Sequence, residues 1–147
     1  VEQLALLHLL ATGFMVGLIW TIHAVHYPLF AFVPEPYAPF QSEHMRRITL
    51  LLAVPWGVEV LSGVSLALLA DGGAERTLAF VGAGLIVVIV AVTGLLAAPA
   101  HGRLLERFDA GEHRVLMRID LLRTVLGLIP GTVFLYPPLT ARAVFRR

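Results

Sequence analysis

The chain of 147 residues has the length of one domain, and 58% of its residues are hydrophobic while only 14% are charged. Soluble domains carry roughly a quarter charged residues, so this composition favours an integral membrane protein. The formal charge of +1 gives no argument for nucleic acid as a partner, and the absence of cysteine excludes disulfides, thiolate metal sites and cysteine nucleophiles.

Four apolar segments predict an all-α bundle of four transmembrane helices in a single domain. These helices are expected at about 4–26, 38–70, 78–99 and 115–136. Each is close to or above the roughly 20 residues that cross the hydrocarbon core of a bilayer. A short polar turn at 71–77 joins the second helix to the third. The first segment is too long, and too polar at its end, for a cleaved signal peptide, so we expect it to remain as a helix.

The charged loops predict an orientation. Four crossings place residues 28–47 and 100–114 at one face of the membrane, and both termini with residues 71–77 at the other. The first face carries more arginine than the second. Basic residues concentrate in cytoplasmic loops, so we expect these two loops in the cytoplasm and the termini outside it. Lipid surrounds the chain in this interpretation.

The first helix carries three histidines. His8 and His26 are eighteen residues apart, which is five whole turns of an α-helix and about 27 Å along its axis. We therefore expect His8 at the opposite membrane face, as an interfacial residue with an ordinary hydrogen bond. His23 and His26 project from nearly the same side, just before Pro28, where the helix is expected to end. Imidazole is a common metal ligand, although histidines and aromatic residues at helix ends are also common at membrane interfaces.

The second helix adds a histidine and a buried acid. His44 lies at the same face as the histidine pair, whereas Glu59 falls near the bilayer midplane. An unpaired carboxylate there costs about 2.5 kcal/mol or more, so Glu59 is expected to be protonated, paired, or bound to a metal or substrate. A purely structural alternative is a protonated Glu59 bonded to Ser62, to Thr93 or to a carbonyl freed near Pro55. His44 and Glu59 are about 22 Å apart on a straight helix and cannot share an ion.

The last two helices complete the candidate site. His101 ends the third helix at the face that holds His23, His26 and His44. In the fourth helix Asp120 and Arg123 are three residues apart and are expected to pair, which costs less than two lone charges. Arg123 lies one turn deeper, where it can hold an anion or the carboxylate of Glu59. His113 is expected to be solvated in a charged loop.

The residues resemble a family of small bacterial four-helix membrane proteins over nearly the whole chain. The matching positions are Val25–Phe30, Phe40, His44, Arg47–Ile48, Val54–Pro55, Glu59, Pro99–His101, Leu104 and Leu122–Thr124. Such proteins tend to carry Asn-Trp before the Arg-Thr of the last helix, where this chain has Asp120–Leu121. In size and helix count the chain is also similar to anthrone-oxygenase-like membrane proteins. The resemblance implies the architecture and a location in the bacterial inner (plasma) membrane, and it supplies no reaction.

The histidines favour a membrane-embedded metal site, and with it a redox enzyme. His26, His44 and His101, with His23 as a further ligand, would hold iron, copper or zinc at one face of the bundle. Glu59 and Arg123 would line a pocket for a small lipophilic substrate such as a quinone or a polyketide-like aromatic. A b-type haem held by two of the histidines is a variant of this hypothesis.

Two other hypotheses remain open from the sequence. A proton-coupled carrier or channel module would use Glu59 as its titrating group and the histidines as a relay, because intramembrane acids commonly mark such paths. Four helices are few for a transporter, so this hypothesis requires a homo-oligomer. In an accessory subunit of a larger membrane complex, the polar residues would only satisfy one another.

Overall fold

The structure is a computed structural model that describes residues 2–70 and 72–134. These residues contain helices and turns and no strand, which confirms the predicted all-α class. The elements in chain order are α1 (Glu2–Thr21), the π-helical turn η1 (Ile22–His26), the 3₁₀ turn η2 (Pro28–Phe32), α2 (Tyr37–Leu69), α3 (Gly73–Val92), the π-helical turn η3 (Thr93–Ala97), α4 (Ala98–Arg103) and α5 (Ala110–Phe134).

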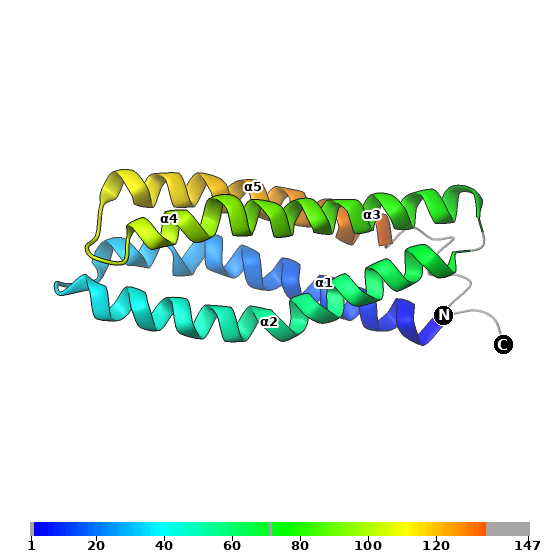
Figure 1. Cartoon of the computed structure of the whole chain (residues 1–147), viewed down its shortest axis with the longest axis horizontal. Helices are drawn as coiled ribbons and strands as arrows, with labels where there is room; N and C mark the ends of the chain where they lie inside the picture. The colour runs from blue at the N-terminus through cyan, green and yellow to red at the C-terminus, as the bar shows by residue number, and fades with distance from the viewer. Residues whose placement is uncertain (1, 71, 135–147) are drawn as a thin grey trace.

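Four long helical rods lie side by side (Figure 1). The first joins α1 to η1 and η2, the second is α2, the third joins α3 to η3 and α4, and the fourth is α5. Each rod packs on two neighbours, because α1 and α3 both contact α2 and α5. The loop after η2 and the loop between α4 and α5 lie at the same end of the bundle, and the N-terminus lies at the other (Figure 1).

Three of the rods are long and apolar enough to cross a membrane. They comprise Glu2–Phe32, Tyr37–Leu69 and Arg76–Arg103, with 31, 33 and 28 residues. The described part of α5 does not join them, because it carries Arg118, Asp120 and Arg123 within the stretch that would lie in the bilayer. The prediction of a fourth span therefore stays a prediction.

The exterior of the bundle is apolar, and its interior holds polar side chains among apolar ones. Large hydrophobic side chains are exposed on every rod, from Leu128 at 38% to Phe32 at 81%. Among the described residues ten polar or charged side chains are buried: His8, Thr12, Gln41, His44, Glu59, Ser62, His101, Asp120, Arg123 and Thr124. Large exposed apolar surfaces are rare on soluble domains, so an apolar solvent suits this exterior.

Local chemistry explains where the rods differ from the predicted ranges. The fourth rod begins at Ala110 and not near 115, because the Asp109 carboxylate accepts bonds from the N–H groups of Gly111 and Glu112 and so caps the helix. The third rod extends from Gly73 to Arg103, beyond the predicted 78–99. Pro55 lies inside α2 without ending it, and Figure 1 shows α2 bent about midway along its length.

Candidate functional site

A π-helical turn carries Tyr27 into the bundle. The backbone N–H of Tyr27 donates to the carbonyl of Ile22, five residues earlier, at 2.9 Å. This turn holds one residue more than an α-helical turn, so Ile22 and Tyr27 lie on the same buried side. His26, which the sequence predicts on nearly the same side of the helix as His23, is half-buried beside Tyr27.

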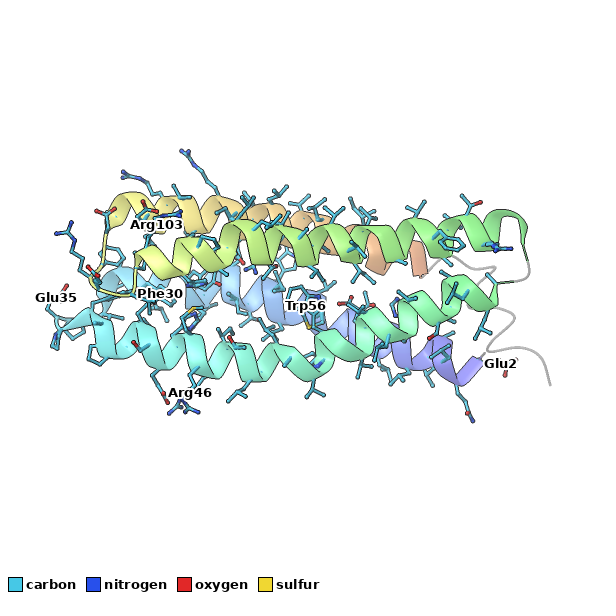
Figure 2. The ribbon with its side chains drawn as sticks, in the orientation of Figure 1. Glu2, Phe30, Glu35, Arg46, Trp56 and Arg103 are labelled. Carbon is cyan, nitrogen blue, oxygen red and sulfur yellow. The ribbon has the colours of Figure 1, made fainter. Side chains whose placement is uncertain are left out.

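Three of the four predicted metal ligands lie together. The Nε2 atom of His26 is 3.0 Å from the Nδ1 atom of His44, and their ring centroids are 4.9 Å apart. The ring of His101 lies 5.2 Å from the ring of His44. Phe30 packs edge-on against His44 at 4.9 Å, and Figure 2 shows Phe30 inside the end of the bundle that holds the two loops. His26, His44 and His101 are called the histidine cluster below.

A second layer of polar residues fixes the ring of His101. Its Nε2 atom is 2.8 Å from the hydroxyl oxygen of Tyr27. The Gln41 amide nitrogen donates to Nδ1 of His101 at 3.1 Å and to the backbone carbonyl of His101 at 3.2 Å, while the Gln41 oxygen accepts from the Tyr37 hydroxyl. A neutral His101 ring that accepts at Nδ1 carries its proton on Nε2 and donates it to Tyr27.

The histidine cluster has one imidazole nitrogen with no partner. His44 is 7% exposed, and its Nε2 atom is buried without a hydrogen bond in the structure. Leaving such an atom unpaired costs about 1–3 kcal/mol, so the position favours a ligand. In residues 2–70 and 72–134 no group of three or more histidine or acidic side chains already converges on one point. The reason is local: His26 and His44 face each other, and His101 faces Tyr27.

His23 lies apart from the histidine cluster. Its Nδ1 atom is 3.0 Å from Oδ2 of Asp120, which is fully buried. The other oxygen of Asp120 accepts from Arg123, as expected from their spacing, and Arg123 also donates to the Thr93 hydroxyl at 3.2 Å. These bonds tie the first, third and fourth rods together. His23 therefore bonds to a carboxylate through Nδ1, and the structure does not pack its ring against the other three histidines.

A cavity lies between the four rods, next to this network. Glu59, Thr93, Arg123 and Thr124 are its polar lining residues, and Trp56 closes part of an otherwise apolar wall. Figure 2 shows Trp56 near the middle of the bundle. The free volume is about 480 Å³ up to the open mouth, of which the centres of water molecules can reach about 30 Å³. That space holds about two water molecules, so a larger ligand must displace lining side chains.

Arg123 connects the cavity with the histidine cluster. Its guanidinium group lines the cavity and also interacts with the Tyr27 hydroxyl, which in turn contacts His101. Arg123 is only 5% exposed, and its Nε atom is buried without a hydrogen-bond partner in the structure. Glu59 and Arg123 thus share one cavity, as the sequence predicted, and a single tyrosine separates that cavity from His101.

Two histidines are less exposed than the sequence predicted. His8 forms the expected hydrogen bond, but it does so inside the bundle: it is fully buried and bonds to Ser62 at 2.8 Å across the α1–α2 contact. The sequence of the first helix does not predict this burial, because the hydrogen-bond partner of His8 lies 54 positions away. His113 is not solvated: its Nε2 atom is 2.8 Å from the carbonyl oxygen of Tyr27, and its ring stacks on Phe30. The helix cap at Asp109 starts α5 early enough to turn His113 inward.

The sequence reasoning also missed Tyr27 and Gln41. Tyr27 follows His26 in the sequence, where an aromatic residue is typical of a helix end at a membrane interface. Gln41 lies four residues after Tyr37, so a buried polar stripe at the start of the second rod was the available signal.

Comparisons with protein-family models, curated proteins and solved structures find no match to this chain, so the family resemblance stays a prediction.

Proposed function

We propose that this chain is a bacterial inner-membrane protein that binds a transition metal ion at His26, His44 and His101. It oxidises or reduces a small lipophilic substrate held in the cavity beside them. The observation that carries the proposal is the 3.0 Å approach of His26 and His44, with the ring of His101 5.2 Å from that of His44.

The surface supports four membrane crossings. Apolar side chains cover the outside of the rods, while the charges of Asp120 and Arg123 are buried against each other inside α5. A charge pair turned toward the bundle does not prevent a helix from crossing a bilayer. The exposed Arg118 lies nearer the loop end of α5, where a long side chain can reach the headgroups. In this arrangement the two arginine-rich loops are cytoplasmic and the N-terminus is outside.

The histidine cluster needs little movement to hold a metal ion. Metal–nitrogen bonds of 2.0–2.1 Å in a tetrahedral site separate two ligand nitrogens by about 3.4 Å. The nitrogens of His26 and His44 are 3.0 Å apart, so a metal ion would replace the hydrogen between them after a small widening. His101 would join through Nε2 by exchanging its Tyr27 contact for the metal; its hydrogen would then lie on Nδ1, and the Gln41 amide would turn over so that its oxygen accepts this hydrogen and orients the ring. An all-imidazole set suits copper or zinc, and redox chemistry selects copper.

The cavity supplies the substrate site. Its wall is largely apolar, and its polar groups are few and converge from α2, η3 and α5. Arg123 offers a positive charge and a free N–H to a substrate oxygen, and Glu59 faces the same space as a proton donor or acceptor. Through Tyr27, a substrate oxygen on Arg123 lies close to the metal ligand His101.

Metal content tests the proposal. Protein purified in detergent and incubated with copper or zinc should retain about one ion per chain by elemental analysis. His44→Ala should lose it. The matched control is His23→Asn, because His23 bonds to Asp120 and should not affect the stoichiometry. A wild-type protein that retains no metal as purified or after loading would overturn the proposal. A Soret band in the optical spectrum would instead support the haem variant.

A further inference from the structure

A second chain of polar contacts leads away from the cavity, from Glu59 to α1. The Glu59 carboxyl interacts with the Thr12 hydroxyl of α1. The Thr12 oxygen is 3.4 Å from Nε2 of His8, and Nδ1 of His8 is 2.8 Å from the Ser62 hydroxyl. All four side chains are buried, at 7% exposure or less. Of these four residues, the proposed redox function uses Glu59 alone.

The positions of the hydrogen atoms along these contacts follow from Ser62, the last residue of the series. The Ser62 hydroxyl donates to the backbone carbonyl of Val58 at 2.6 Å, so its oxygen must accept from His8. A neutral His8 ring with its hydrogen on Nδ1 has a bare Nε2, which accepts from Thr12. The Thr12 oxygen is then free to accept from a protonated Glu59. Every hydrogen thus points from Glu59 toward His8.

We propose that Thr12 and His8 form a proton path that takes the proton of Glu59 from the cavity toward the N-terminal end of the bundle. The Glu59 proton moves to the Thr12 oxygen while the Thr12 proton moves to Nε2 of His8. The products are a carboxylate and an imidazolium, and no proton or electron is gained or lost. Intramembrane acids and histidines in contact are common components of such relays.

Burial disfavours both charged products of this transfer, so the charge-separated state is short-lived. The Ser62 oxygen and the backbone carbonyl of Glu59, which faces the ring of His8, offset part of this cost for the imidazolium. Arg123 on α5 is the charged group that lines the cavity with Glu59, and the third rod contributes the neutral Thr93. Gly63 leaves room for the ring, because a Cβ atom there would lie 2.9 Å from Cε1 of His8.

Hydrogen–deuterium exchange of the Glu59 carboxyl tests the path. The protein is reconstituted in phosphatidylcholine vesicles, and the infrared C=O band of protonated Glu59 is assigned by its loss in Glu59→Gln. After a change to D₂O, Thr12→Val should slow the exchange of this band by about tenfold or more, because it removes the only hydroxyl between Glu59 and His8. Thr12→Ser retains the hydroxyl and should exchange at the wild-type rate.

Thr93→Val is the matched control, because Thr93 lines the same cavity on the Arg123 side. It should leave the exchange rate unchanged. Unaltered exchange in Thr12→Val, or slowed exchange in Thr93→Val alone, would overturn the proposed path. Circular dichroism confirms that each variant keeps its helices. The measurement needs neither metal nor substrate, so its outcome is independent of the proposed redox function.

Discussion

The Nε2 atom of His26 and the Nδ1 atom of His44 are 3.0 Å apart, so two imidazoles from different rods share one hydrogen inside the bundle. The arrangement is held from outside, since Phe30 packs against both rings and Gln41 orients the neighbouring His101. A shared hydrogen at this position can be replaced by a metal ion only if the rings are already in place. Substitution of the residues that surround the histidine cluster should therefore change the metal affinity, as substitution of the ligands does.

Gln41→Leu should weaken metal binding about 10–100-fold, because loss of an outer hydrogen bond to a ligating histidine typically has this effect. The leucine cannot form a hydrogen bond with Nδ1 of His101, so the ring is no longer held toward the other two. The measurement is competition with a metal-binding dye of known affinity. Gln3→Leu, at an exposed position of α1, is the control and should bind metal as the wild type does.

Asp120→Asn should destabilise the protein by about 3–5 kcal/mol, because it leaves Arg123 charged and unpaired inside the bundle. Thermal unfolding in detergent measures the loss. The double variant Asp120→Asn with Arg123→Met removes both charges and should recover part of it. Glu43→Gln breaks an exposed pair with Arg46 and should leave the unfolding temperature unchanged. If Asp120→Asn and Glu43→Gln lowered the unfolding temperature equally, the result would contradict a buried Asp120–Arg123 pair.

Gly63→Ala should destabilise the α1–α2 contact by about 1–3 kcal/mol, because the added methyl group meets the ring of His8 and Cδ1 of Ile86. Gly57→Ala in the same helix meets no atom within 4 Å and should be neutral or stabilising by up to about 1 kcal/mol. Unfolding in increasing sodium dodecyl sulfate compares the two variants. If both stabilise the protein equally, His8 does not pack against Gly63.

The start of α5 should fray in acid. The N–H groups of Glu112 and Gly111 donate to the Asp109 carboxylate and hold its pKa below the ordinary value of 3.8. A lowered pKa in the folded state means that the cap stabilises above the unfolded pKa and is lost as pH falls through the lowered value. Amide exchange of Glu112 should therefore accelerate in that range. Asp109→Asn, which keeps an acceptor without the charge, should show no such step.

Much of the architecture could be predicted, because it depends on the lengths of apolar runs and on the positions of charged loops. Those signals gave the helical class, the ends at which the loops gather, and the grouping of His26, His44 and His101. The predicted separation of His44 and Glu59 along the second rod was also correct, because the two residues occupy separate sites. These are properties of single segments and can be read from rise per residue.

Contacts between rods could not be predicted in the same way. The inward position of Tyr27 depends on a backbone bond to Ile22 that spans five residues, and a pattern with a period of 3.6 assigns that position to His26. The burial of His8 depends on Ser62, and the orientation of His101 depends on Gln41 in a different rod. No local rule links residues so far apart in the sequence.

The first and third rods each contain one surplus residue, in the turns Ile22–His26 and Thr93–Ala97, which precede Tyr27 and His101. Deleting a single residue from either turn would restore ordinary α-helical winding and rotate everything that follows by about 100° around the axis. Tyr27 would then swing away from His101, or His101 away from Tyr27. Sequences that share this interior should therefore keep both surplus residues, and a single-residue gap in either turn marks a protein with a different interior.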